Sequence, residues 1–347
     1  IPGVRSIGTV GSVGASRDLR IRGTSSFGLG QRPVIYIDGV KVDARQGEWA
    51  AMGSSCCSFS GGAGVDRLND LNPNDIDRIE VIKGAAAGTL YGSEATNGVI
   101  QIFTKKGRSD SAPRWSVQVT TGAQRYRPNF QTTTYPQFTG LDGTKALDAN
   151  KALLENGPYL GGDLTVQGGS STATYFVSGG YVDEQGGIQP NWMKRGNLRL
   201  NMHWLASQKL SFDVTSAYTR NKVFDLSSGN NWTSLLGNAV LGVPYNACKT
   251  CADGIERPYG EPWVPIAAIK KIEIFDDANR WTGGITGNYN PTASFTNKFQ
   301  LGLDVVNEER SFLRPFGFPY TYVPAGEKSL GYRNFRSVTV EYLGTLA

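Results

Sequence analysis

His203 is the one histidine in the 347 residues, and it sets a limit on catalytic chemistry. A hydrolytic triad needs a histidine as its base. His203 lies on the polar side of an alternating segment, beside Arg199 and Asn201, where a side chain lining a polar interior is the expected role. We therefore predict no enzymatic activity and no catalytic residue.

Other groups that could do chemistry have simpler interpretations. The carboxylate pairs Asp75/Asp77, Asp276/Asp277 and Glu308/Glu309 lie in segments typical of helix caps or loops, where charge is usually solvated. The glycine-rich runs at 28–30 and 61–64 lack the Lys-Ser/Thr pair of a phosphate-binding loop. Asp38-Gly39 indicates a hairpin turn. We predict no cofactor.

The four cysteines are Cys56, Cys57, Cys248 and Cys251. An adjacent pair plus one CxxC is a poor set of zinc ligands, and no βαβ setting supports a thioredoxin-like motif. We predict no metal site, an oxidising compartment, and one or two loop disulfides, with Cys248–Cys251 as a possible pair. Four cysteines allow three connectivities, and the sequence leaves all three open.

Composition narrows the class of partner. The net charge is +5, the mean hydropathy is −0.30, and the only basic cluster is at 105–108, so nucleic-acid binding is not supported. No apolar run approaches the roughly 20 residues of a membrane-spanning helix. Glycine is abundant, with 44 residues, which favours a β-rich chain with many turns.

From Trp115 onward the sequence alternates between apolar and polar residues. In 195–205, Leu198, Leu200, Met202 and Trp204 share one face, and Arg195, Arg199 and His203 share the other; Asp213 belongs to the polar face of the next segment. The pattern predicts about eight strands, near 115–119, 164–167, 173–182, 195–205, 210–219, 281–289, 295–305 and 338–342.

The predicted connections alternate in length. Those near 169–171, 206–209 and 291–293 are tight, whereas 125–161, 184–194, 222–278 and 313–328 are long. Short turns on one side and long loops on the other are typical of outer-membrane barrels. The alternative is a soluble β-sandwich, which would bury Leu198, Leu200 and Trp204 between two sheets.

The segment 71–107 has a different character. Asn72-Pro73 indicates a helix start, 78–83 and 99–103 are short strand candidates, and the glycines between them mark turns. The pattern alone is that of a small α/β domain.

Four motifs occur in a specific order: IRG (21–23), YIDGV (36–40), RIEVIKG (78–84) and LYGSEATNGVI (90–100). Over roughly residues 4–107 they resemble the plug domain of TonB-dependent outer-membrane transporters, in particular the SusC/RagA-like branch. The resemblance implies an α+β plug domain over 1–107, a linker at 108–113, and the N-terminal part of an antiparallel transmembrane β-barrel over 114–347. A plugged lumen requires about 22 strands, so we expect the chain to be a piece of a longer barrel.

The resemblance also implies a function, namely TonB-dependent import of a bulky nutrient such as an oligosaccharide or peptide across the outer membrane of a Gram-negative-type bacterium. Implied partners are a TonB-type energy-transducing protein, a SusD-like surface lipoprotein lid and outer-membrane lipid. Two alternatives stay open: a siderophore or metal-chelate receptor of the same superfamily, and a non-transporting surface protein that reuses the fold.

The resemblance assigns roles to further residues. Arg22, and Arg78 or Glu80, would pair with charges on the barrel wall and gate the lumen; the alternative is that Arg22 anchors the plug permanently. Arg195, Arg199, His203 and Asp213 would face that lumen. Aromatic side chains could stack on a substrate; these are Trp49 in the plug and Trp232, Tyr245, Tyr259 and Trp263 in the longest loop.

Overall fold

The computed structural model describes most of the chain. The described residues are 3–8, 11–21, 32–44, 64–83, 85–109, 111–125, 140, 142–149, 153–227, 232–292, 294–318 and 325–346. They form a small N-terminal α/β domain and one large antiparallel sheet. Arg22, Trp49, Cys56 and Cys57 lie outside the described residues.

The N-terminal domain contains two small sheets. Strands β1 (Val4–Gly8) and β2 (Arg17–Ile21) form an antiparallel pair. The second sheet has the order β4-β3-β6-β5, and its strands are β3 (Val34–Ile37), β4 (Val40–Val42), β5 (Ile76–Ile82) and β6 (Val99–Thr104). Helices η1 (Arg67–Asp70), η2 (Pro73–Asp75), α1 (Ala85–Tyr91) and η3 (Ser93–Asn97) connect these strands.

Isoleucine side chains of the central strands β3 and β6 fill the core of this domain. Ile35 and Ile37 pack with Ile100 and Ile102, and all four are buried. β3 and β6 run parallel, and β4, η1, η2, β5, α1 and η3, which lie between them in sequence, form the crossover that parallel neighbours need. The expected helix start at Asn72-Pro73 is one turn of 3₁₀ helix, in which the Asn72 side chain accepts a hydrogen bond from the Asn74 backbone N–H.

The β3–β4 hairpin turns at the predicted Asp38-Gly39 pair. Both residues have positive φ, 48° and 81°, as a two-residue hairpin turn requires. The Asp38 carboxylate accepts hydrogen bonds from the Thr104 backbone N–H and hydroxyl at 2.9 and 2.6 Å. These bonds fix the hairpin against the end of β6.

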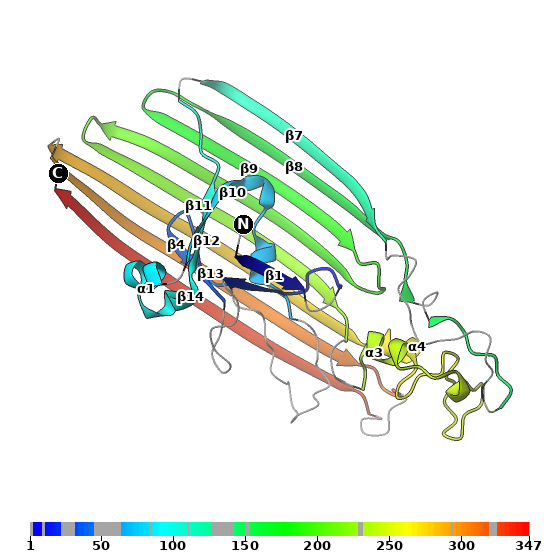
Figure 1. Cartoon of the computed structure of the whole chain (residues 1–347). Coiled ribbons are helices and arrows are strands. Elements are labelled where there is room, and N and C mark those ends of the chain that lie inside the picture. Colours follow the sequence, from blue (N-terminus) through cyan, green and yellow to red (C-terminus); the bar gives the residue numbers. More distant parts are fainter. Residues whose placement is uncertain are drawn as a thin grey trace.

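The large sheet is an eight-stranded meander in which each strand pairs with the next in sequence (Figure 1). Its strands are β7 (Ser111–Gln124), β8 (Gly157–Gly169), β9 (Ala173–Gln185), β10 (Trp192–Ser207), β11 (Leu210–Asp225), β12 (Glu273–Thr292), β13 (Phe295–Arg314) and β14 (Glu327–Leu346). All eight predicted strands are present. The N-terminal domain lies against one face of the sheet, between the edges formed by β7 and β14.

The two faces of the sheet differ as the alternation predicts. Arg199, Asn201 and Asp304 point toward the N-terminal domain and are buried. On the opposite face Trp115 is 68% exposed and Leu198 62% exposed, and Leu200 and Trp204 are also exposed. This contradicts the sandwich alternative, because no second sheet covers the apolar face among the described residues.

The connections differ in length at the two ends of the sheet. Tight turns follow β8, β10 and β12, whereas 226–272 and 315–326 are long connections at the other end. The expected long connection at 184–194 is wrong: it spans only 186–191, because β9 and β10 continue to Gln185 and Trp192. Within the described residues, no helix is long and apolar enough to cross a membrane.

The long connection after β11 folds over a small apolar core that it shares with the ends of β12 and β13. It contains α3 (Leu235–Val240), η4 (Pro244–Asn246) and α4 (Ile266–Ile269). Leu235, Ile266 and Ile269 pack there with Leu153 and Phe312. The helices lie beyond the strand ends, at the end of the sheet opposite the C-terminus (Figure 1).

Candidate functional site

Buried charged groups join η1 to the inner face of the sheet. Arg67 Nη2 lies 2.9 Å from Asp276 Oδ1 on β12, and neither side chain is exposed to solvent. Arg280, also on β12, makes two 2.9 Å contacts with Asp304 on β13 and donates a 2.9 Å hydrogen bond to the Arg67 carbonyl. Asp70 lies 3.8 Å from Arg67 and 3.7 Å from Arg280. We call these five residues the η1 charge cluster.

The cluster extends to β14 through Arg333. Its guanidinium contacts Asp43, which follows β4, at 2.5 Å, and Glu308 on β13 at 2.7 Å. The Asp43 backbone N–H donates to Asp304 at 2.8 Å. The N-terminal domain is therefore bound through charged groups to three consecutive strands.

Burial and neighbouring charges act in opposite directions on Arg67. Burial acts to lower the pKa of its guanidinium, but Asp70 and Asp276 outweigh this and raise it. Arg67 is thus held in its charged form at any pH the protein meets.

The segment 69–74, from the end of η1 into η2, is hydrogen-bonded to β8, β10 and β11. Arg195 donates to the Asn69 carbonyl at 2.6 Å, and Thr219 donates to the Asp70 carbonyl at 3.0 Å. The amides of Asn72 and Asn74 donate to the two oxygens of one carboxylate, Asp163 on β8, at 2.6 and 2.7 Å. Backbone and side chains of 69–74 are both recognised by the sheet.

Asp75 ends this segment as a second buried carboxylate. It accepts a 2.6 Å hydrogen bond from Ser178 and lies 3.3 Å from Arg199, which also lies 3.5 Å from Asp38. Burial raises the pKa of the Asp75 carboxyl, and the contacts with Ser178 and Arg199 oppose that rise only in part.

The β3–β4 hairpin fits a notch formed by glycines. A Cβ at Gly302 of β13 would lie 2.6 Å from Val40 Cγ2, and one at Gly284 of β12 would lie 2.9 Å from the same atom. Gln300 donates to the Asp38 carbonyl at 3.0 Å, and the Lys41 N–H donates to the Thr339 hydroxyl at 3.0 Å. The sheet lacks side chains where Val40 is seated.

Known proteins resemble this chain in sequence and in fold. Residues 1–99 match the family described as the TonB-dependent Receptor Plug Domain. The chain is 24% identical over 310 residues to the TonB-dependent receptor SusC of Bacteroides thetaiotaomicron, covering 86% of this chain and 27% of SusC. It is 25% identical over 348 residues to the TonB-dependent receptor P26 of Formosa agariphila, covering 89% of this chain and 31% of P26.

Among solved structures, that of the RagAB peptide importer in the closed-closed state aligns with a TM-score of 0.75 at 21% identity, covering 99% of this chain and 42% of that one. Residues 1–99 form a TonB-dependent receptor plug domain. The relatives of the longer chain are TonB-dependent receptors of the SusC/RagA-like branch and outer-membrane receptors of Gram-negative bacteria, and its fold is that of a plug domain followed by part of their barrel. The chain spans less than a third of the length of SusC and P26.

The barrel residues predicted to face inward lie on the plug side of the sheet. Arg195 and Arg199 contact the plug directly. His203 lies 3.1 Å from Asp213, and Lys106, just after the plug sheet, also lies 3.1 Å from that carboxylate.

Arg78 and Glu80 are placed differently. They lie on β5, pair with each other at 2.9 Å, and are both about half exposed. β5 is the edge of the plug sheet opposite β4, the strand that contacts β12, β13 and β14. Their expected pairing with the wall is not made by the eight strands described.

One prediction about carboxylates is wrong. Asp75, Asp276 and Glu308 are buried at the plug–barrel interface and are not solvated loop charges. Their neighbours in sequence differ, since Asp77 is exposed beside Arg78 and Asp277 forms an ion pair with Arg220 on the outer face.

The loop aromatic residues fall into two groups. Tyr259 and Trp263 pack against the loop core, and the Trp263 ring lies 5.8 Å from that of Trp232, edge to face. Trp232 and Tyr245 are exposed. Tyr245 lines an open hollow of about 570 Å³ together with Cys248 and Cys251, which form a disulfide.

Metal binding finds no support in the described part of the chain, which holds no group of three or more His, Cys, Asp or Glu side chains placed to bind an ion.

Proposed function

We propose that this chain is the plug and first wall of a transporter that imports a bulky nutrient, an oligosaccharide or peptide, across the outer membrane. The plug would close the lumen, and a TonB-type partner would displace it. The observation that carries the proposal is the plug's seat on the inner wall, formed by the η1 charge cluster and by Asp75 with Arg199.

The chemistry of this seat suits a gate. Buried ion pairs add little net stability, because the cost of desolvation offsets the attraction between the charges. Removing one partner is nevertheless costly, because it leaves the other charge buried without compensation. Such contacts hold the plug in one position without the large apolar surface of a permanent core. When the plug moves, the separated charges become hydrated again, so the seat can open and close repeatedly.

Arg78 and Glu80 have a place in this proposal. They project from the plug edge opposite the described wall. Since a plugged lumen requires about 22 strands, strands beyond the eight described here would face them. Arg22 is the third gating candidate of this kind.

The substrate proposal rests on the relatives and on the loops. RagAB is described as a peptide importer, and its structure aligns well with this chain. Trp232 and Tyr245 are exposed on the long connection after β11 and offer flat apolar faces to a sugar ring or a peptide side chain. A SusD-like surface lipoprotein would cover this side as a lid.

A siderophore receptor is the second candidate. The chain is 30% identical over 160 residues to the rhizobactin receptor of Rhizobium meliloti, covering 45% of this chain and 17% of that receptor. Against this, the siderophore receptor PirA of Acinetobacter baumannii aligns with a TM-score of only 0.54, compared with 0.75 for RagAB.

An uptake assay separates these candidates. Cells carrying the full-length gene, and matched cells with it deleted, would be given fluorescent oligopeptides, fluorescent oligosaccharides or ferric siderophores. We expect uptake of a peptide or oligosaccharide that needs the gene and stops when a protonophore removes the energy source. Uptake of ferric siderophores alone would favour the second candidate, and no gene-dependent uptake of any probe would contradict transport.

A further inference from the structure

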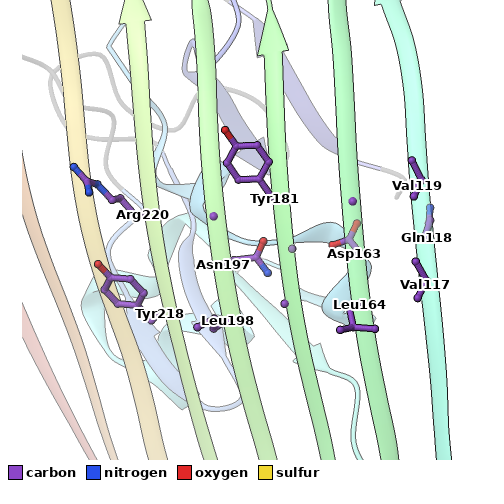
Figure 2. A pocket seen from close by; sticks show the side chains of 14 residues that line it. Val117, Gln118, Val119, Asp163, Leu164, Tyr181, Asn197, Leu198, Tyr218 and Arg220 are labelled. Carbon is purple, nitrogen blue, oxygen red and sulfur yellow. The ribbon is translucent and has the colours of Figure 1, made fainter.

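The outer face of the sheet carries a hollow of about 580 Å³ across β7 to β11 (Figure 2). Its floor consists of Gly162, Gly179 and Gly196 on three neighbouring strands. Its rim consists of the side chains Val117, Leu164, Leu198, Tyr181 and Tyr218, with Arg220 at one end. The plug lies behind these strands, on the other side of the sheet.

Strand register explains why the face is hollow here. Tyr181 pairs with Gly162 on one side and with Gly196 on the other, and Gly179 pairs with Leu164 and Leu198. Partners in register share a face, so all three glycines lie on the outer face. A Cβ at Gly162 or Gly196 would meet nothing within 4 Å, which means that the space above them is open.

The position of the hollow determines what can occupy it. It lies within the exposed apolar face, which in an outer-membrane barrel contacts the hydrocarbon of the bilayer. An apolar hollow holds water poorly, because water needs polar partners. The occupant is therefore a flexible apolar chain, and lipid acyl chains are what the bilayer provides there.

Charged side chains lie at the end of the hollow nearest the long connections. Lys194 and Lys222 pair in register one row beyond Gly196, and Lys194 also pairs with Asp183. Arg220 pairs with Gly196 in the row of the hollow itself and is bonded to Asp277 at 2.9 Å. The cations project further than the acids: Arg220 is 62% exposed against 24% for Asp277, and Lys194 is 49% exposed against 31% for Asp183. The outermost charges at this end of the hollow are positive.

Aromatic side chains mark the same level as a membrane interface. Trp192, Phe224 and Phe275 form a cluster with ring centroids 4.8 to 6.3 Å apart, and Lys222 lies 5.1 Å from the Phe275 ring. Aromatic belts lie at headgroup depth in membrane proteins. The cations beside this cluster are thus at the height of lipid phosphates.

We propose that the hollow binds one acyl chain of an anionic, phosphate-bearing membrane lipid. Its headgroup would lie at Lys194, Arg220 and Lys222, and its chain over Gly162, Gly179 and Gly196. This site faces away from the plug and does not depend on the transported substrate.

Native mass spectrometry of the full-length protein tests the proposal. The protein would be released from nanodiscs of phosphatidylcholine with a minority of phosphatidylglycerol, and the retained lipids would be counted. We expect one retained phosphatidylglycerol. Filling the floor with Gly162→Leu and Gly196→Leu would displace at least two buried methylenes of the chain and weaken retention about tenfold. Gly287→Leu is the matched control, since its Cβ would meet only the Phe212 ring at 3.5 Å on the same face.

The charge part is tested separately with Arg220→Gln and Lys222→Gln. We expect these variants to retain a lipid but to lose the preference for phosphatidylglycerol. The control Lys209→Gln, at a tight turn at the opposite end of the sheet, should retain that preference. Equal retention of both lipids by the unmodified protein would overturn the headgroup assignment. Unchanged lipid retention in the double leucine variant would overturn the acyl-chain site. A dimer of the unmodified protein that carries no lipid, and that the double leucine substitution separates into monomers, would overturn it too, because it would show a second copy of the chain in the hollow.

Discussion

Arg67 of the plug and Asp276 of β12 form a 2.9 Å ion pair from which solvent is excluded. Asp276 lies 209 positions further along the chain. The pair forms only when the plug lies against the inner face of the sheet, because that packing is what brings Arg67 next to β12. Arg280 donates to the Arg67 carbonyl and so orients the backbone from which that side chain projects.

Replacing Arg67 should weaken the seat strongly. Arg67→Met leaves Asp276 and Asp70 buried without their shared cation, and breaking a buried pair in this way costs about 3–5 kcal/mol. In planar bilayers we expect the full-length variant to show frequent open-channel currents where the unmodified protein shows few.

Arg220→Gln is the control for that variant. Arg220 is exposed on the outer face of the sheet, away from the plug, and pairs with Asp277; exposed pairs contribute at most about 1 kcal/mol. Its loss should leave the current unchanged. If Arg67→Met is as quiet as Arg220→Gln, the η1 charge cluster is not what holds the plug.

The faces of the barrel strands were predictable because side chains alternate with a period of two. Leu198 and Leu200 are exposed on the outer face and Arg199 is buried on the plug side, as that alternation indicated. The plug domain was predictable from four motifs that occur in a specific order. Its hairpin turn was predictable from the pair Asp38-Gly39.

The charge cluster could not be predicted in the same way. Beyond the apolar band both faces of a strand carry polar residues, and the alternation is lost. In β12 the inward Asp276 is followed by the outward Asp277, so the sequence resembles a solvated loop although it is a strand. The burial of Asp75 depends on the wall that covers it, and neighbouring residues carry no sign of that wall.

Gly302→Val should displace the plug hairpin. The new Cβ would lie 2.6 Å from Val40 Cγ2, and overpacking of this kind typically costs about 1–3 kcal/mol. We expect a lower urea midpoint for plug unfolding, measured on the full-length protein in detergent. Adding Val40→Ala should restore most of the loss, whereas Gly287→Val, on the outer face, should leave the midpoint in place. A double variant no better than Gly302→Val alone would show that the notch is not where the strain arises.

Asp75 should make plug docking depend on pH. Its pKa is raised in the docked state, so that state binds a proton more readily than the undocked state does. By linkage, docking weakens as the pH rises from the ordinary Asp value, about 4, through the raised pKa, and it is constant above that. The urea midpoint for plug unfolding should therefore rise on acidification.

Two asparagine variants isolate this contribution. Asp75→Asn cannot titrate and should flatten the slope of midpoint against pH, while Asp77→Asn, at an exposed position, should preserve it. Identical slopes for the unmodified protein and Asp75→Asn would assign the pH dependence to other carboxylates.

The Cys248–Cys251 disulfide should stabilise the long connection after β11 without affecting the barrel. The cross-link closes a short loop, for which chain entropy predicts about 2 kcal/mol. Converting both cysteines to serine should speed backbone hydrogen exchange around 242–262 and leave β11 and β12 as protected as before. That locality is expected because the disulfide lies outside the core that the connection shares with β12 and β13, to which neither cysteine belongs. Faster exchange in the strands as well would mean that the loop core helps hold the barrel wall together.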